Sequence, residues 1–153
     1  MEIYRVAFIG HRELNDPFGL RDQIEEIAKD LLRQKEFVEF YVGRNGEFDE
    51  MAASAIKRVQ KNVGTYNNSL TLVLPYPVKD EPYYADYYDN IMYPVSPDTH
   101  FKAAITKRNE WLVENADLLI SFVEHESGGA YQTQKYAQKL GVEVINLAIK
   151  REE

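Results

Sequence analysis

The stretch "IYRVAFIGHR", residues 3 to 12, decides the fold of this 153-residue chain. Its first seven residues are mostly apolar and predict a buried strand, which ends at the glycine, histidine and arginine that follow. Gly10, His11 and Arg12 could hold a ligand at the end of this strand, or could form only a polar turn. Which of the two is expected depends on what the rest of the chain places opposite them.

Strands alternate with helices along the whole sequence. Apolar runs predict five strands, and residues at helical spacing predict four helices between them. The predicted strands cover residues 3 to 9, 37 to 42, 69 to 77, 116 to 123 and 142 to 148; the helices begin near Asp16-Pro17, at Asp49, near residue 99 and at Gly129 or Ala130. This alternation predicts the α/β class, a three-layer fold with a five-stranded, mainly parallel sheet of order 3-2-1-4-5 and helices on both faces.

A crevice is expected where this order changes direction. Strands 1 and 4 are neighbours, and the loops that follow them diverge to opposite faces of the sheet. The loop after strand 4 contains Ser127, Gly128 and Gly129 directly before a helix. The first free N–H groups of a helix bind phosphate or carboxylate, so this loop favours an anion site over a merely flexible turn. Gly10, His11 and Arg12 would face that site.

A second glycine loop follows strand 2. Gly43, Arg44 and Gly46 precede a predicted helix, with Asp49 as its natural cap. The loop lacks the lysine and hydroxyl of a phosphate-binding P-loop and does not match the dinucleotide fingerprint. Contact with a ligand and simple capping by Asp49 are equally compatible with this pattern.

Arg108 is unusual because it lies on the apolar stripe of the third predicted helix, in register with Phe101, Ile105 and Leu112. A guanidinium on a buried face needs an anion or an exit to water. Three alternatives remain open: a ligand phosphate, a structural carboxylate such as Asp117, or extension of the side chain into solvent.

Composition excludes several classes of function. The formal net charge is −7, and the Lys and Arg residues are scattered, which argues against a surface for double-stranded nucleic acid. The absence of cysteine excludes disulfides and thiolate metal sites, and three dispersed histidines predict no metal centre. No apolar run is long enough to span a bilayer, so we expect a soluble cytoplasmic protein without a membrane partner.

We expect one domain over residues 1–153, with an insertion at about residues 76–98. Residues 76 to 97 contain six tyrosines and four prolines, far more than a short connection requires. This composition fits a lid over the crevice or an interface in a homodimer better than a solvated loop, because six exposed tyrosines are costly.

Five motifs in order resemble the SLOG superfamily, the Rossmann-like group that includes YpsA-like proteins, DprA and LOG phosphoribohydrolases. The motifs are "FIGHR", "VGRNGEFDEMAA", "LVLPYP", "KRNEWLVENADLLISF" and "SGGAYQTQKYAQKLGVEVINL". The resemblance implies a pocket for a nucleotide or a nucleotide-derived small molecule, such as an ADP-ribose-like ligand. It places Arg108 and Asn109 in that pocket, beside the glycine loops.

The final motif departs from the LOG pattern, in which a glutamate takes part in cleaving the N-glycosidic bond. Here Gln132 and Gln134 flank Thr133 where the acid should follow, and an amide cannot exchange the required proton. The YpsA-like branch is the better match. The resulting prediction is a nucleotide-ligand sensor or regulator with no assigned catalytic residue; the alternative is a hydrolase or transferase that uses Asp49, Glu124 or Glu126.

Overall fold

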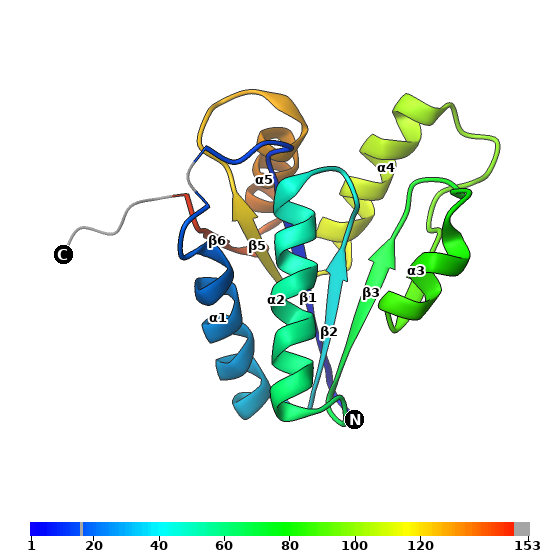
Figure 1. The fold of residues 1–153 in the computed structure, drawn as a ribbon. Helices are drawn as coiled ribbons and strands as arrows, with labels where there is room; N and C mark the ends of the chain where they lie inside the picture. The colour runs from blue at the N-terminus through cyan, green and yellow to red at the C-terminus, as the bar shows by residue number, and fades with distance from the viewer. Residues whose placement is uncertain (16, 149–153) are drawn as a thin grey trace.

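The computed structural model describes residues 1–15 and 17–148, which form a parallel sheet with helices on both sides (Figure 1). The sheet has the order β4-β3-β2-β1-β5-β6, and every neighbouring pair is parallel. Its strands are β1 (Ile3–Gly10), β2 (Phe37–Val42), β3 (Asn68–Val73), β4 (Asn90–Met92), β5 (Leu118–Phe122) and β6 (Glu143–Asn146). The helices are α1 (Leu20–Gln34), α2 (Glu47–Val63), α3 (Glu81–Tyr87), α4 (Phe101–Glu114) and α5 (Gly128–Leu140).

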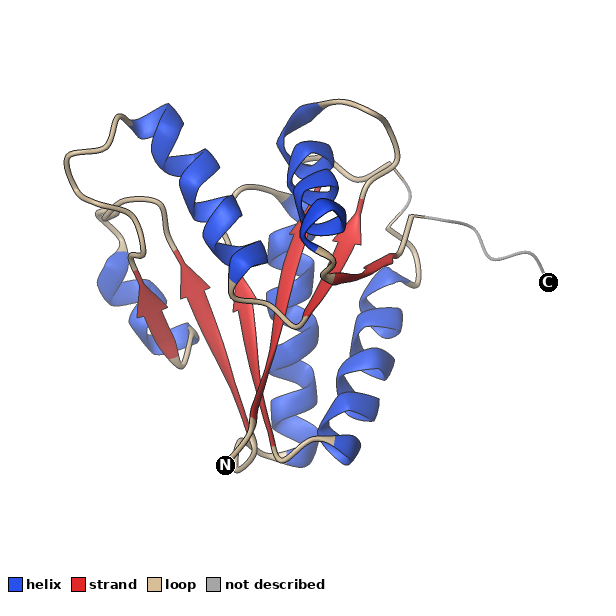
Figure 2. Cartoon of the chain, turned by 180° about the vertical axis from the view of Figure 1, so that it is seen from behind, coloured by secondary structure: helices blue, strands red, loops and turns tan. Residues whose placement is uncertain are grey.

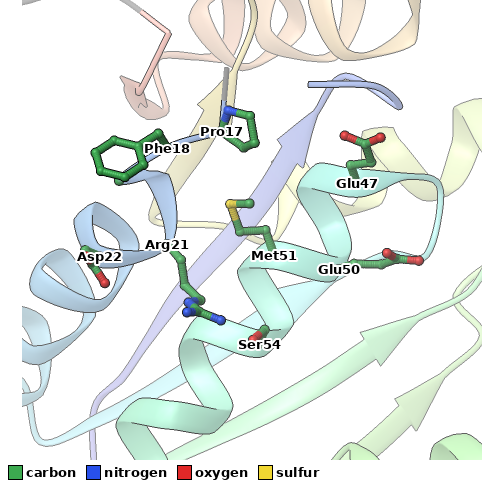
Figure 3. A pocket seen from close by; sticks show the side chains of 9 residues that line it. Pro17, Phe18, Arg21, Asp22, Glu47, Glu50, Met51 and Ser54 are labelled. Carbon is green, nitrogen blue, oxygen red and sulfur yellow. The ribbon is translucent and has the colours of Figure 1, made fainter. Parts of the chain in front are cut away.

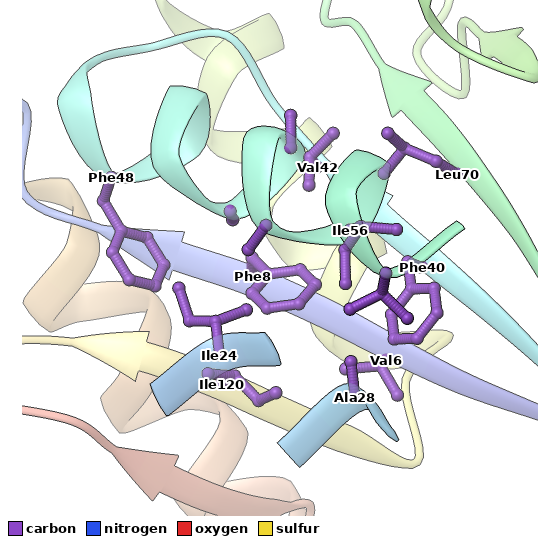
Figure 4. Packing of buried hydrophobic residues seen from close by; sticks show 14 of the residues in the cluster. Val6, Phe8, Ile24, Ala28, Phe40, Val42, Phe48, Ile56, Leu70 and Ile120 are labelled. Atoms are coloured by element: carbon purple, nitrogen blue, oxygen red, sulfur yellow. The ribbon is translucent and has the colours of Figure 1, made fainter. Parts of the chain in front are cut away.

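Successive side chains of β1 point to opposite faces of the sheet, which explains why a layer of helices packs on each face. Val6 and Phe8 point into a core beneath α1 and α2, whereas Ala7 and Ile9 point into a second core beneath α4 and α5. Figure 4 shows Phe8 in the first core, packed among side chains from α1, α2 and the neighbouring strands. Figure 2 shows α4 and α5 covering the opposite face. A strand that is buried on both faces lies in the interior of the sheet, which places β1 at its centre.

The predicted α/β class and its two helix layers are confirmed, but the prediction of five strands in the order 3-2-1-4-5 is wrong. The structure has a sixth strand, β4, which extends the sheet beyond β3. Sequence periodicity missed it because the strand is only three residues long, Asn90 to Met92, and lies between tyrosines and prolines. Each of the five predicted strands is present.

The tyrosine-rich insertion builds the edge of the sheet instead of covering its end. It contains α3 and β4, and Tyr84 of α3 is buried against the first core. None of its residues lines the crevice described below. The structure therefore does not support the expected lid.

Two helices begin elsewhere than the sequence indicated. α1 begins at Leu20, after Gly19 in the left-handed conformation with φ 77°; of the predicted start at Asp16-Pro17, Asp16 lies outside the described residues. α2 begins at Glu47, so Asp49 lies in its first turn instead of at its cap. α5 ends at Leu140 with Gly141 in the left-handed conformation, as predicted. Among the described residues, no helix combines the length and the apolar character needed to cross a membrane.

Candidate functional site

A crevice of about 550 Å³ opens at the carboxyl ends of β1 and β5, where the direction of strand order changes. Its walls come from the loops after β1, β2 and β5 and from the first turns of α2 and α5, with α4 on one side. The lining residues are Ile9, Gly10, His11, Arg12, Glu13, Asn15, Asn45, Asp49, Ile105, Asn109, His125, Ser127, Gly128, Gly129 and Ala130.

The N-terminal end of α5 forms one wall. Ser127 occupies the cap position in an extended conformation, and its side chain makes no capping hydrogen bond to the first turn. Gly128 adopts φ 88°, in the left-handed region that favours glycine, and a Cβ at Gly128 or Gly129 would meet no atom within 4 Å. The first N–H groups of α5 thus lie at the positive end of the helix dipole and face open space.

His11 joins the ends of β1 and β5. Its Nε2 atom accepts a hydrogen bond from the backbone N–H of Glu124 at 2.7 Å, so this nitrogen is unprotonated. The ring stacks on His125 with centroids 4.0 Å apart and planes 6° apart. Burial, together with the neighbouring His125, lowers the pKa of His11, although the Glu124 carboxylate opposes this. A neutral His11 therefore anchors the loop that leads into α5.

Arg12 lies on the opposite wall, in a position set by the loop after β2. Its Nε atom donates to the carbonyl oxygen of Asn45 at 3.3 Å, and its own carbonyl accepts the N–H of Glu47 at 2.8 Å. A Cβ at Gly46 would lie 2.4 Å from the Arg12 Cα atom. Gly46 therefore serves the close packing of two loops, and it does not line the crevice.

Asp49 contributes a buried carboxylate to the crevice. It is 6% exposed, and its Oδ2 atom accepts the N–H of Asn45 at 2.8 Å. Its Oδ1 atom is buried and has no hydrogen-bond partner among the described residues. Burial raises the pKa of Asp49, against the opposing effects of the Asn45 N–H and the Arg108 charge. An unpartnered buried acceptor of this kind is unusual and typical of binding or catalytic sites.

Arg108 lies behind the crevice and does not line it. Only 1% of its surface is exposed, and it donates to the carbonyl oxygen of Val73 at 2.8 Å and to Asn109 Oδ1 at 3.0 Å. No carboxylate in the described part of the chain lies within 4.0 Å of its guanidinium. Of the three alternatives, Asp117 is not its partner, since the described residues contain no such ion pair and this carboxylate instead accepts the N–H of Arg5. Arg108 donates to one backbone and one amide oxygen; burial lowers its pKa, and the Asp49 carboxylate opposes this.

The predicted site residues thus separate into two groups. The crevice brings together eight of them: Gly10, His11, Arg12, Asp49, Asn109, Ser127, Gly128 and Gly129. Gly43, Arg44, Gly46 and Arg108 do not line it. The Arg44 guanidinium lies over the ring of Tyr84, 4.3 Å from its centroid, while a Cβ at Gly43 would lie 3.0 Å from both Asp49 Oδ2 and Arg108 Nη1. Whether the eight contact a ligand stays a prediction.

Sequence reasoning missed several lining residues, among them Glu13, Asn45 and His125. Asn45 lies inside the loop after β2 that the sequence already indicated through its glycines, so it could have been predicted as a lining residue. His125 follows β5, and only the pairing of β1 with β5 brings it against His11. Spacing along the chain does not reveal that contact.

The alternative catalytic carboxylates are not equivalent in the structure. Asp49 lines the crevice, whereas Glu124 and Glu126 do not. Gln134, one of the two glutamines that flank Thr133 in the stretch compared with the LOG motif, is buried and accepts a hydrogen bond from the Ser121 hydroxyl. Within residues 1–15 and 17–148, no cluster of three potential ligands could hold a metal ion.

A second cavity of about 570 Å³ lies between the start of α1 and α2 (Figure 3). Its charged residues are Arg21, Asp22, Glu47 and Glu50, so acids outnumber bases by three to one. Phe18 at its edge is 96% exposed. This excess of carboxylates disfavours a phosphate. The crevice also contains two acids, Glu13 and Asp49, beside Arg12, and the feature that favours an anion there is the open N-terminal end of α5.

Comparison with known proteins identifies relatives by fold. No protein-family profile and no curated protein sequence matches the chain. DNA processing protein A (DprA) from Streptococcus pneumoniae superposes with a TM-score of 0.68 at 16% identity, over 93% of this chain and 49% of that chain. The chain has the fold of DprA. DprA from Helicobacter pylori gives a TM-score of 0.64 at 17% identity, over 92% of this chain and 63% of that chain.

The DprA likeness supports the resemblance to the SLOG superfamily at the level of the fold. At 16% and 17% identity the two superpositions show a shared Rossmann-like architecture and nothing finer. The chain spans about half of the S. pneumoniae DprA chain and less than two thirds of that from H. pylori. The activities of the complete DprA proteins therefore do not pass to this chain with the fold.

The prediction about partners is corrected by the comparison. The predicted crevice and the family resemblance led us to expect a small nucleotide-like ligand, and the scattered basic residues led us to expect no double-stranded nucleic acid. The H. pylori DprA structure, with the same fold, was solved to describe the single-stranded DNA binding mode of that protein. Scattered basic residues argue against an interface for double-stranded nucleic acid, but a protein can bind a single strand through contacts with only a few nucleotides. The comparison therefore removes the ground for preferring a small molecule over nucleic acid as the partner.

Proposed function

We propose that this protein binds single-stranded nucleic acid in the crevice, with one phosphate at the N-terminal end of α5. The observation that carries the proposal is the uncapped first turn of α5 beside Gly128 and Gly129, which leave open space in front of its N–H groups. Such a helix end attracts anions through its hydrogen-bond donors and its dipole. The unpartnered Asp49 Oδ1 atom in the same crevice is a second sign that this end of the sheet is built for a ligand.

Charge favours an unpaired strand over a duplex. The chain carries a net charge of −7, so an extended row of phosphates along its surface would be repelled. Arg12 and the α5 N-terminus both line the crevice and can attract a phosphate, although Glu13 and Asp49 line it as well. One or two nucleotides of a flexible single strand can reach such a crevice, whereas the phosphates of a duplex follow a rigid path.

The shared fold supports this partner class, because one DprA with this architecture has a described single-stranded DNA binding mode. Within the superfamily we place the chain in the YpsA-like branch. The support is the stretch "SGGAYQTQK", in which Gln132 and Gln134 flank Thr133 where the LOG acid should follow.

The proposal is tested by a pair of substitutions of nearly equal shape at Gly129. Gly129 does not have a positive φ, and a Cβ there meets open space, so both Gly129→Asn and Gly129→Asp should fold. Gly129→Asp places a carboxylate where the phosphate is proposed to bind, and it also favours the helix dipole. We expect Gly129→Asp to weaken binding of a fluorescent single-stranded oligonucleotide about tenfold or more, as loss of a charge-assisted contact would.

Gly129→Asn should keep binding within about threefold, because it lacks the charge that repels phosphate. Thr65→Asp controls for net charge, since the exposed Thr65 lies in the loop between α2 and β3, at the opposite end of the sheet. Equal affinities for Gly129→Asp and Thr65→Asp in fluorescence anisotropy would contradict the proposal.

One observation favours chemistry at this site as a second candidate function. Burial raises the pKa of Asp49, and a buried carboxyl group that lines a crevice is the kind of group that serves as a general acid. The reaction would be cleavage of the N-glycosidic bond of a bound nucleotide unit. Incubation of the protein with oligonucleotides should then release free base, and Asp49→Asn should abolish the release; absence of free base at high protein concentration rules this candidate out.

A further inference from the structure

We propose that a groove between α4 and α5 is a nucleobase subsite that receives the base next to the phosphate bound at α5. This α4–α5 groove encloses about 320 Å³ and is lined by Thr106, Asn109, Glu110, Gly129, Gln132, Thr133 and Tyr136. The proposal rests on the proposed function, and it specifies which part of a nucleotide lies on which surface.

The groove is continuous with the crevice. Asn109 of α4 and Gly129 of α5 line both spaces, so the groove starts at the helix end where the phosphate is proposed to bind. A nucleobase is joined to its phosphate through one sugar. A ligand anchored at Gly129 can therefore place its base in the groove without crossing an intervening wall.

The chemistry of the two spaces differs in the way that a nucleotide requires. Both spaces contain acids, Glu13 and Asp49 in the crevice and Glu110 in the groove, but an arginine, Arg12, lines the crevice and not the groove. The groove therefore offers no cationic side chain to a phosphate. Uncharged amides and hydroxyls are the groups that hydrogen-bond the edge of a base, and a carboxylate accepts from an exocyclic amino group.

Several groove side chains are available for such contacts. Thr106 and Gln132 are exposed and have no side-chain hydrogen bond within the described chain. Tyr136 presents an aromatic ring, which is held by a hydrogen bond from its hydroxyl to Glu114 Oε2 at 2.9 Å. Stacking on an aromatic ring accepts any base, because every base has a π face. The groove thus combines a stacking surface with free polar groups.

Two variants separate the base subsite from the phosphate site. Gln132→Ala removes one polar contact from the exposed wall, and Thr106→Tyr fills the groove from α4. Gln138→Ala is the matched control, because Gln138 is an exposed glutamine of the same helix outside the groove. Each protein is titrated with a single-stranded DNA 10-mer and with an abasic 10-mer of the same sugar-phosphate length.

We expect Gln132→Ala to weaken binding of the DNA 10-mer about threefold to tenfold, and Thr106→Tyr to weaken it at least as much. Neither should change binding of the abasic strand, and Gln138→Ala should change neither. Gly129→Asp should weaken binding of both strands.

The possible failures are distinct. If the groove variants bind both strands like the wild type while Gly129→Asp weakens binding, the base subsite is wrong and the phosphate site stands. Equal weakening of both strands by the groove variants also overturns the base subsite. If the wild type binds neither strand, the proposed function fails, and the base subsite fails with it.

Discussion

Gly10 is fixed by packing within the protein. A Cβ at this position would lie 2.4 Å from Phe48 Cγ, and Phe48 is fully buried in the first core. The sequence pattern associated Gly10 with close approach of a ligand, and the residue does line the crevice. Its lack of a side chain nevertheless serves the contact between β1 and α2.

Gly10→Ala should therefore destabilise the fold. Overpacking of a well-filled core costs about 1–3 kcal/mol, and the atoms in the way belong to a buried ring. Urea unfolding should show this loss, and Phe48→Leu in the same chain should recover part of it in a double-mutant cycle. If the changes in unfolding free energy of Gly10→Ala and Phe48→Leu are simply additive, a clash with Phe48 is not the reason that position 10 requires glycine.

His11 predicts a pH dependence of stability. Its folded-state pKa lies below that of the unfolded chain, so on acidification the unfolded state takes up the proton first. Stability is therefore lost as pH falls below about 6.5, until folded His11 also binds a proton. The groups that face its ring are His125 and Glu124.

The measurement compares urea unfolding of the wild type and His11→Gln between pH 7.5 and pH 5.5. Glutamine keeps an acceptor and does not titrate, so the variant should lose less stability over this range. One proton contributes at most about 1.4 kcal/mol per pH unit. Parallel pH profiles for the two proteins would show that His11 is not the group responsible.

At the scale of elements, β4 is the strand that the sequence pattern alone did not predict. Long apolar runs such as β1 and β5 were predictable because burial on both faces excludes polar residues. β4 is short, and its place depends on hydrogen bonds from outside its own sequence: Asp89 Oδ2 accepts the N–H of Leu70 at 2.7 Å and Gln60 Nε2 at 2.8 Å. No local pattern encodes such contacts.

Asp89→Ala should loosen this edge of the sheet. Loss of the two hydrogen bonds should cost about 1–3 kcal/mol and speed amide exchange in β3 and β4, with little change in β1 or β5. Asp86→Ala is a suitable control, because it removes an exposed carboxylate of α3 that makes no side-chain hydrogen bond in the described chain. If amide exchange in β3 and β4 is equally fast in the two variants, Asp89 does not hold β4 in place.

The crevice was predictable as a place, because alternating strands and helices fix which loops meet. The full set of residues that line the crevice was not predictable. The register of Arg108 left its partner open and the family resemblance placed it at the ligand, yet three-dimensional packing turns it toward Val73 and away from the crevice. Contacts between loops, such as His11 with His125, require the pairing of β1 with β5.

At the scale of the whole molecule, a net charge of −7 limits how many phosphates can be engaged. A strand held at one crevice neutralises one or two phosphates, so the logarithm of affinity should fall with the logarithm of salt concentration at a slope of about −0.7 to −1.4. Oligonucleotide titrations between 25 mM and 200 mM salt measure this slope. A slope of −3 or steeper would require an extended phosphate contact that the crevice does not offer.

The most direct test of the central claim is the response of backbone amides to a single-stranded oligonucleotide in ¹⁵N-labelled protein. The account predicts that the largest chemical-shift changes fall on Gly128, Gly129 and Ala130, with smaller changes at His11 and Arg12. Saturating binding with changes confined to other surfaces, or no change at any amide, would contradict a phosphate site at the start of α5.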